Sequence, residues 1–352
     1  MLCMKHSLAE WHEDLKKDNR LYWWLREWYA FGRIALGRFL DRPVRQRKKR
    51  LLFYHVSGLS FAGTETFLQL VAKYLSKDRY DVYFMYADRE IAKTASTDLQ
   101  SRLRSILEGG VFPIRFEYTD RKHTMPYEIT GMSPSIFDVI RDFQIDALVT
   151  AGAGHAEFPF SAVSNIPVIL INIFGQPNQQ KNITHHVCIS QAVANKIAPI
   201  VPKDRIRVMY IPSELPPDET YEWGRALRHE LGIPREALVF GRVGRASDDI
   251  FDPIGLRAFA QIAADNPDVH YLIVAPPPAA RELVERERIP RVHFHPGSGL
   301  PRDMWSFYGA MDVLAHFRRD GESFGLNIAQ AMLAGRPILS HRSVVWNAHL
   351  EY

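Results

Sequence analysis

The strongest constraint on the fold is a rhythm of short apolar runs and amphipathic stretches that occurs twice along the chain. In the first series, the candidate strands and one candidate helix lie at residues 51–56, 64–75, 81–86, 147–150 and 167–171. Apolar runs of this length, separated by helical patterns, are typical of a parallel sheet that is covered by helices on both faces. The first series therefore predicts one α/β domain.

The rhythm stops near three prolines and then restarts. Pro212, Pro216 and Pro217 mark a predicted linker. The second series contains candidate strands and helices at residues 237–243, 253–264, 269–274, 291–294, 312–315, 324–334 and 336–339. Two such series predict two Rossmann-like domains that face each other, with the ligand site in the cleft beyond the carboxyl ends of the strands. The predicted boundaries are 1–50 for an N-terminal helical extension, 51–212 for the first domain, 213–220 for the linker and 221–352 for the second domain.

The composition favours an ordinary globular protein. Hydrophobic residues make up 46% of the 352 residues, which is enough for a substantial core. The two cysteines, Cys3 and Cys188, are far apart in sequence, so we expect no disulfide framework and a cytoplasmic, reducing location. No window approaches the roughly 20 apolar residues of a membrane-spanning helix, and the charged N-terminus is unlike a signal peptide. Neither an Asp-x-Asp pair at a strand end nor a His/Cys cluster is found, so we expect no metal.

Residues 20–50 differ from the rest of the chain. Aromatic residues crowd positions 21–31, and basic residues form a cluster over 42–50, in a chain of net charge +4. Aromatic and basic side chains together suit the surface of an anionic membrane. The alternative is that the rings pack on the protein's own surface and that the basic cluster is a solvated linker. One short basic cluster without interleaved aromatics is weak support for nucleic-acid binding, which we do not expect.

The turn that follows the first candidate strand contains Gly58 and Gly63. Glycine lets the backbone approach a ligand closely, and the N–H groups at the start of a helix attract phosphate. No lysine follows Gly63, so the turn is not a P-loop, and its glycine spacing is not that of a dinucleotide-binding fingerprint. The alternative is that these glycines serve turn geometry alone.

Arg245 follows the first strand of the second series, at its carboxyl end. A guanidinium group at this position would face the predicted cleft and could hold a diphosphate by two-point contact. The alternative is a surface arginine that pairs with Asp248 or Asp249.

Glu322 and Gln330 lie at and within the candidate helix over 324–334. Their eight-residue separation corresponds to about 12 Å along a helix. One side chain could then lie near a transferred sugar and the other near a ribose, with the helix N-terminus facing a diphosphate. The alternative from the residues alone is a helix-start carboxylate and a surface amide.

In combination and in this order, these segments resemble the retaining nucleotide-sugar glycosyltransferases of glycosyltransferase family 4, over about residues 51–352. That family has the GT-B fold, in which two Rossmann-like domains face each other. The most specific match is to its Glu-x7-Glu block. The matching segments are Gly63-Thr64-Glu65, Val243-Gly244-Arg245, residues 301–313, Gly321-Glu322-Ser323-Phe324-Gly325 and residues 331–337.

The resemblance implies a role for each matching residue. Glu322 would approach the transferred sugar, and His155 matches loosely a family histidine that touches this sugar, with a structural histidine as the alternative. Gln330 would hold the ribose hydroxyls, and Arg245 would neutralise the leaving diphosphate. The residues implied for the donor and its phosphates are Gly63, Thr64, Arg245, Arg318, Arg319, Ser323, Phe324, Gly325 and Gln330.

The chain departs from the family pattern in four places, one of which is the stretch 275–278, where Ala-Pro-Pro-Pro replaces a usual glycine-bearing loop. The second acid of the Glu-x7-Glu block is Gln330, which can hydrogen-bond a ribose without a charge. The acidic stretch 248–252 stands where the family usually has a lysine, and Arg318 or Arg319 would have to compensate. The chain also ends soon after the last candidate strand, so we expect an incomplete second domain.

The resemblance implies an enzyme that moves a sugar from a nucleoside-diphosphate sugar to a glycan or lipid-linked acceptor, with retention. Side chains and helix ends would stabilise the leaving diphosphate, so no metal or other cofactor is expected. The implied setting is polysaccharide or glycolipid assembly by a cytoplasmic protein, peripheral at the inner face of the membrane. The alternative, motivated by Gln330, the acidic stretch 248–252 and the early end of the chain, is a GT-B-like binding or partner subunit without transfer activity.

Overall fold

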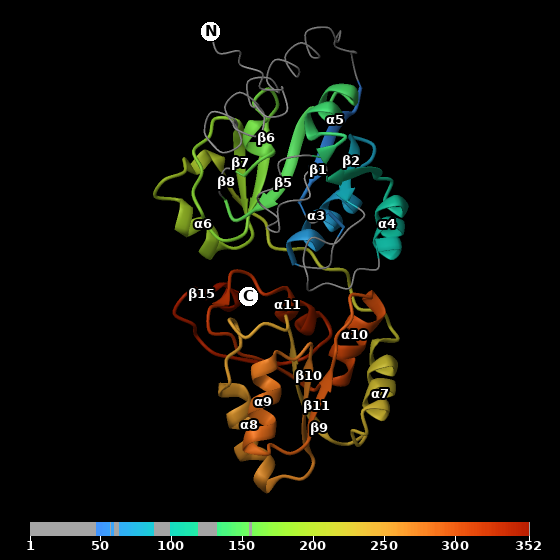
Figure 1. Ribbon diagram of the computed structural model, residues 1–352, viewed down its shortest axis with the longest axis vertical. Helices are drawn as coiled ribbons and strands as arrows, with labels where there is room; N and C mark the ends of the chain where they lie inside the picture. Colours follow the sequence, from blue (N-terminus) through green and yellow to red (C-terminus); the bar gives the residue numbers. More distant parts are fainter. Residues whose placement is uncertain are drawn as a thin grey trace, which may run out of the picture.

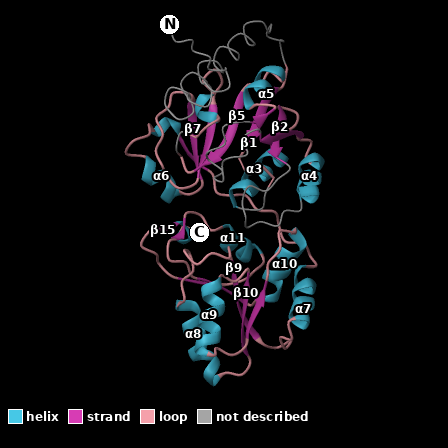
Figure 2. Cartoon of the chain, viewed as in Figure 1, coloured by secondary structure: helices cyan, strands magenta, loops and turns pink. Residues whose placement is uncertain are grey.

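The computed structural model describes residues 47–56, 58–59, 63–87, 99–118, 132–154 and 157–351. Two mainly parallel sheets lie one after the other along the long axis, each with helices on both faces (Figure 1, Figure 2). This architecture confirms the predicted α/β class with two Rossmann-like units.

The first sheet has eight strands in the order β4-β3-β2-β1-β5-β6-β7-β8. Only β4 is antiparallel to its neighbour within this sheet of the described chain. The strands are β1 (Lys49–Tyr54), β2 (Tyr80–Ala87), β3 (Phe112–Tyr118), β4 (Met132–Ser133), β5 (Ala147–Gly152), β6 (Val168–Asn172), β7 (Ile183–Cys188) and β8 (Ile206–Val208).

Helices cover both faces of this sheet. Helices α3 (Gly63–Tyr74), α4 (Leu99–Glu108) and α6 (Gln191–Ile197) contribute to the apolar core on one face. Helix α5 (Ile136–Asp142) and the short helix Phe160–Ala162 contribute to the core on the other face. Because a parallel sheet buried on both faces needs apolar residues throughout, its strands read as the continuous apolar runs seen in the sequence.

The second sheet has five parallel strands in the order β11-β10-β9-β12-β14. They are β9 (Leu238–Val243), β10 (Val269–Val274), β11 (Val292–His295), β12 (Val313–His316) and β14 (Ile338–Ser340). Strands β13 (Gly321–Glu322) and β15 (Trp346–Asn347) pair separately.

The helices of the second sheet also lie in two layers. On one face, α7 (Thr220–Glu230), α10 (Pro301–Ala310) and α11 (Leu326–Leu333) bury their apolar residues. On the other face, α8 (Ile254–Asp265) and α9 (Pro278–Glu287) do so. Proline occupies the first turn of both α9 and α10, where its missing N–H costs no helical hydrogen bond.

Every candidate strand and helix from the sequence is present, with ends that differ by at most two residues. The described strands and α-helices that the apolar rhythm did not reveal are β3, β4, β7, β8, β13, β15, α4, α5, α6, α7, α9 and α10. They carry more polar residues than the elements that were found. Strand β7, for example, reads Ile-Thr-His-His-Val-Cys.

The two units touch through the loop between β13 and α11. Phe324 is 4% exposed and belongs to the core cluster of the first unit, where it stacks on Tyr210 at 5.9 Å between ring centroids. The Glu351 carboxylate accepts hydrogen bonds from the backbone N–H groups of Gln191 and Ala192 at the start of α6. The C-terminal end therefore lies between the two sheets (Figure 1).

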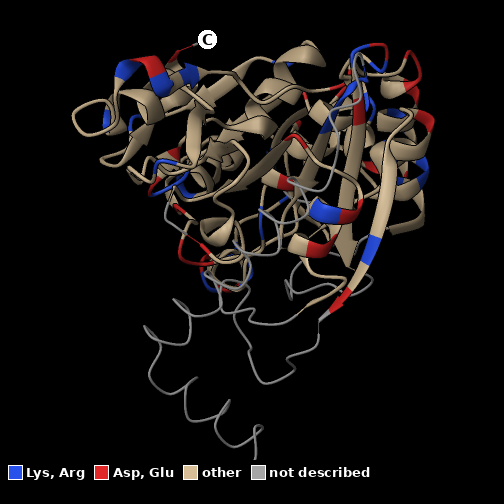
Figure 3. Ribbon diagram, turned by 90° about the horizontal axis from the view of Figure 1, so that it is seen from above, with Lys and Arg blue, Asp and Glu red and all other residues tan. Residues whose placement is uncertain are grey.

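Charged residues of both signs are interspersed along the described chain in the view from above (Figure 3). Cys188 is a buried free thiol, and burial raises its pKa to about 12. None of the described helices is long and apolar enough to cross a membrane. Most of the aromatic and basic segment 20–50 lies outside the described residues.

Candidate active site at the carboxyl end of the second sheet

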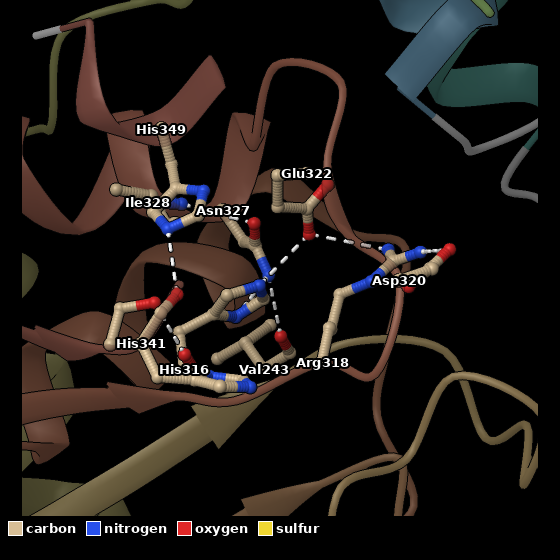
Figure 4. Close-up of polar contacts among 10 residues, drawn as sticks. Val243, His316, Arg318, Asp320, Glu322, Asn327, Ile328, His341 and His349 are labelled. Atoms are coloured by element: carbon tan, nitrogen blue, oxygen red, sulfur yellow. Dashed lines mark hydrogen bonds and ion pairs between the residues drawn. The ribbon is translucent and has the colours of Figure 1, made fainter. Parts of the chain in front are cut away.

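Glu322 is held in place by two hydrogen bonds to one of its oxygens. It lies in β13, six residues after His316 at the end of β12. Its Oε1 accepts from His316 Nε2 at 2.9 Å and from Arg318 Nη1 at 3.2 Å (Figure 4). The side chain is 12% exposed, so a predicted sugar-binding carboxylate lies nearly buried among polar partners.

These partners decide the charge of Glu322. Burial raises the pKa of this carboxyl group, but the hydrogen bond from His316 and the positive charges around the carboxylate, with Arg318 among them, together lower it by more, so that the net pKa lies below its usual value. Glu322 is therefore an ionised carboxylate at neutral pH.

The guanidinium group of Arg318 donates hydrogen bonds to two neighbouring carboxylates. Its Nε and Nη2 donate to the two oxygens of Asp320 at 2.9 and 2.7 Å, and Nη1 donates to Glu322. The two-point contact with Asp320 fixes the guanidinium group, and its third hydrogen bond orients Glu322. The role that the sequence suggested for Arg318, pairing with a diphosphate, competes with these contacts. Arg319 is exposed, and its backbone N–H donates to Ile250.

The turn before α11 brings the predicted phosphate-binding residues to the helix N-terminus. Gly325 is the N-cap residue and has a φ of 99°, a left-handed conformation that glycine adopts without strain. Ser323 precedes Phe324, which packs into the first unit as described above. Backbone N–H groups at such a helix start favour anionic groups.

Gln330 lies one turn from the end of α11 and turns its amide oxygen inward. The hydroxyl of Tyr308, which is fully buried in α10, donates to Gln330 Oε1 at 3.0 Å. The amide NH₂ group and the second lone pair of the oxygen remain for a ligand.

Arg245 lies on the surface next to acidic residues. Its side chain is exposed, and its positive charge lowers the pKa of Asp249, after the larger effect of a hydrogen bond from the Ser247 hydroxyl. Asp248 accepts a hydrogen bond from the backbone of Ala279 at the start of α9. Both the predicted diphosphate contact of Arg245 and the alternative of a surface pair with Asp248 or Asp249 stay predictions.

On the first unit, Gly63 and Thr64 form the start of α3. An added Cβ at Gly63 would meet no atom of the described residues within 4 Å. Next to them, Glu65 lies 3.7 Å from His55, whose pKa is lowered mainly by burial. His155 lies outside the described residues.

Three polar residues of this region, Asn327, His316 and Arg242, were not predicted from the sequence. Asn327 donates from Nδ2 to the carbonyl of Val243 at 2.8 Å, and the same nitrogen lies 3.1 Å from His316 Nδ1. Arg242 is 4% exposed in β9, near Glu322 and Arg318. The signal for Arg242 was a charged residue inside an apolar strand, because charges are rarely buried unless they are paired.

Among the residues that the structure describes, no three His, Cys, Asp or Glu side chains are grouped so that they could bind a metal. The polar cluster consists instead of the Glu322 carboxylate, the His316 and Arg318 side chains that donate to it, and the Asn327 amide. Such a cluster can hydrogen-bond a hydroxyl group of a ligand. It can also orient the start of α11, whose backbone N–H groups favour anions.

Comparisons with known proteins agree with this picture. Residues 237–348, which include Glu322 and its partners, match the family model of glycosyl transferases group 1. The chain matches no curated protein sequence.

Solved structures of glycosyltransferases share the fold. HepE of Anabaena in complex with UDP and glucose is 16% identical, with a TM-score of 0.58 over 87% of this chain and 83% of that chain. A glycosyltransferase from Rickettsia africae is 14% identical, with a TM-score of 0.59 over 85% and 80% of the two chains. WaaG, a glycosyltransferase involved in lipopolysaccharide biosynthesis, is 15% identical, with a TM-score of 0.57 over 86% and 83%. The chain is therefore a GT-B-fold protein whose residues 237–348 match the glycosyl transferases group 1.

Proposed function

We propose that this protein is a glycosyltransferase that moves a sugar from a nucleoside-diphosphate sugar to a glycan or lipid-linked acceptor. The observation that carries the proposal is the family match over residues 237–348, which contain Glu322 in an ionised, oriented state. The shared fold with HepE, whose structure holds UDP and glucose, supports a nucleotide-sugar donor.

The proposed chemistry is electrostatic and does not use a metal. The bond between the sugar C1 and the diphosphate oxygen breaks, and its electron pair stays on the diphosphate. The acceptor hydroxyl bonds to C1 on the same face, with retention, and its proton passes to the leaving diphosphate. The start of α11 at Gly325 would stabilise the charge that develops on this group.

The proposed setting is the cytoplasmic face of a membrane. Its support is the aromatic and basic segment 20–50 of the sequence. Deleting residues 1–46 tests this and leaves Arg47 in place, which donates to Asp146 at the start of β5. We expect the full chain to sediment with anionic liposomes and the shortened chain to stay in the supernatant. Equal sedimentation of both would contradict the membrane role.

A second candidate is a GT-B-like binding or partner subunit without transfer activity. It is favoured by Arg318, which is occupied by Asp320 and Glu322, and by Arg245, which lies beside Asp249. Fewer cations are then left for a diphosphate than a transferase of this kind would use. Tight donor binding without turnover on any acceptor would favour this candidate.

Thermal unfolding with UDP, GDP, ADP, CMP and their sugar conjugates tests the proposal. A ligand that binds only the folded protein at about 100 times its Kd stabilises it by about 2.7 kcal/mol. We expect one diphosphate and its sugar conjugate to raise Tm, and the increase from the conjugate to shrink in Glu322→Ala. Arg286→Ala, an exposed change on α9, is the matched control. No increase with any of these ligands would contradict the proposed function.

A further inference from the structure

The amide of Asn327 has only one orientation that satisfies its neighbours. Its Nδ2 lies 2.8 Å from the carbonyl oxygen of Val243, which can only accept a hydrogen bond. Its Oδ1 lies 3.1 Å from the backbone nitrogen of Ile328, which can only donate. A reversed amide would place like groups together on both sides, so Asn327 must present an N–H group to its third neighbour.

That third neighbour is the Nδ1 atom of His316. The distance from Asn327 Nδ2 is 3.1 Å, and a donor there requires a lone pair on Nδ1. The ring proton of His316 is then on Nε2, which donates to Glu322 Oε1 at 2.9 Å. His316 is 4% exposed, so its ring is shielded from bulk solvent. Its backbone carbonyl accepts a hydrogen bond from the Ser340 hydroxyl of the neighbouring strand.

A second proton on His316 would point from Nδ1 at the amide hydrogens of Asn327. The other charged or titratable groups near this pair are Arg318, Asp320, Arg242 and His349. None of them replaces the lone pair that Asn327 requires. His316 therefore acts on Glu322 as a neutral donor, and the carboxylate keeps its negative charge. Figure 4 shows how Asn327, His316 and Glu322 lie next to one another.

We propose that Asn327 is a positioning residue which fixes the tautomer of His316 and thereby keeps Glu322 as a hydrogen-bond acceptor for a hydroxyl of the donor sugar. The inference rests on the proposed function for the identity of the ligand, but its first half, the tautomer, stands on the hydrogen bonds alone. Glu322 Oε1 is occupied by His316 and Arg318, so the second carboxylate oxygen is the one assigned to the sugar.

The tautomer is tested without any substrate. Long-range ¹H–¹⁵N spectra of the full chain with ¹⁵N-labelled histidine report which ring nitrogen carries the proton, and His316→Gln identifies the signals of His316. At pH 7.5 we expect the proton on Nε2. In Asn327→Asp the carboxylate accepts from Nδ1, so both nitrogens should be protonated. A wild-type ring protonated on Nδ1 would overturn the proposal, and Asn266→Asp, on the exposed end of α8, should leave the signals unchanged.

The effect on ligand binding is tested by calorimetry with UDP-glucose and UDP as probes. We expect Asn327→Asp to bind UDP-glucose about tenfold more weakly, because a doubly protonated His316 neutralises much of the Glu322 charge, and a hydrogen bond from the sugar to a neutralised group is weaker than one to a charged group. It should bind UDP as the wild type does. Unchanged affinity for UDP-glucose in a folded variant that binds UDP would overturn the positioning role.

A pair of variants at His316 keeps the test valid if Asn327→Asp does not fold. Glutamine can donate to Glu322 from its own amide, whereas leucine cannot. We expect His316→Gln to keep the preference for UDP-glucose over UDP and His316→Leu to lose it. If neither UDP nor UDP-glucose binds the wild type, while the other nucleotides of the thermal screen also fail, the proposed function fails, and the spectra still decide the tautomer.

Discussion

At the scale of the residue, the charge of Glu322 makes a contribution to stability that depends on pH. Its pKa in the folded protein lies below that of the unfolded chain, because the effect of burial, which raises it, is outweighed by the His316 hydrogen bond together with the positive charges around the carboxylate. A carboxyl group of this kind stabilises the fold fully above its unfolded pKa of about 4.3. The contribution is lost as the pH falls through the folded value.

Replacing Glu322 by glutamine removes this charge with almost no change in shape. At pH 7 we expect the free energy of unfolding to fall by roughly 1.5–3 kcal/mol, the worth of hydrogen bonds to a charged group. The difference between wild type and variant should shrink as the pH approaches 3. Urea denaturation across this range measures it, with the exposed Glu236→Gln as control. A difference that does not vary with pH would contradict the assigned ionisation.

The sequence identified Glu322 and Gln330, whereas most of their partners came only from the structure. A resemblance assigns roles only to residues that match the family's motif, so it predicted roles for the residues of the loop before α11. Asn327, His316 and Tyr308 act through contacts between a helix start, a strand end and a separate helix. Spacing along the chain does not encode such tertiary hydrogen bonds, and it also could not show that Arg318 is held by Asp320.

At the scale of the element, the backbones of α7 and α10 approach each other closely. Gly224 and Gly309 face each other there, and a Cβ on Gly224 would overlap the backbone of Gly309. Both glycines therefore allow the two backbones to approach. Arg228 of α7 adds hydrogen bonds to the carbonyl of Ala310 and to Asp312.

This packing reverses the usual sign of a glycine substitution in a helix. Alanine normally stabilises a helix interior by roughly 0.5–1 kcal/mol relative to glycine. We expect Gly224→Ala to lower the free energy of unfolding by about 1–3 kcal/mol instead, because the methyl group overpacks the contact. Chemical denaturation measures this, with the exposed Glu222→Ala of the same helix as control. A stabilised Gly224→Ala protein would show that the helices can separate at no cost.

The apolar rhythm predicted the buried central strands most reliably, since strands such as β10 are buried along their whole length. It missed α7 and β7 for a physical reason. Helix α7 buries only a narrow stripe and is otherwise charged, and β7 places His186 in the core, where its Nε2 bonds the Asn178 carbonyl. Polar residues at buried positions interrupt the apolar pattern from which a strand or helix is predicted.

At the scale of the whole molecule, Glu351 joins the C-terminal end to the first unit. Its carboxylate accepts from the N–H groups of Gln191 and Ala192 at 2.9 and 2.7 Å and from the hydroxyl of Tyr210 at 3.2 Å. A carboxylate at a helix start compensates the exposed N–H groups and the helix dipole, which is worth about 1 kcal/mol.

Glu351→Ala should therefore expose these two amides. We expect their hydrogen exchange to become several-fold faster, in line with a loss of about 1 kcal/mol. Exchange of the buried strand β10 should stay as it is, which provides the internal control. Unchanged exchange at Gln191 and Ala192 would mean that water replaces the carboxylate without loss.

The same C-terminal segment also touches the strand that carries Glu322. Strand β15 pairs with β13, with Asn347 opposite Glu322, and Lys196 of α6 lies 4.5 Å above the ring of Trp346. Helix α6, β15 and β13 are thus linked in series. Any rotation of one sheet against the other must either break the contacts of Glu351 and Trp346 with α6 or shift the strand beside the carboxylate. Movement of one sheet relative to the other is therefore coupled to the backbone that carries Glu322.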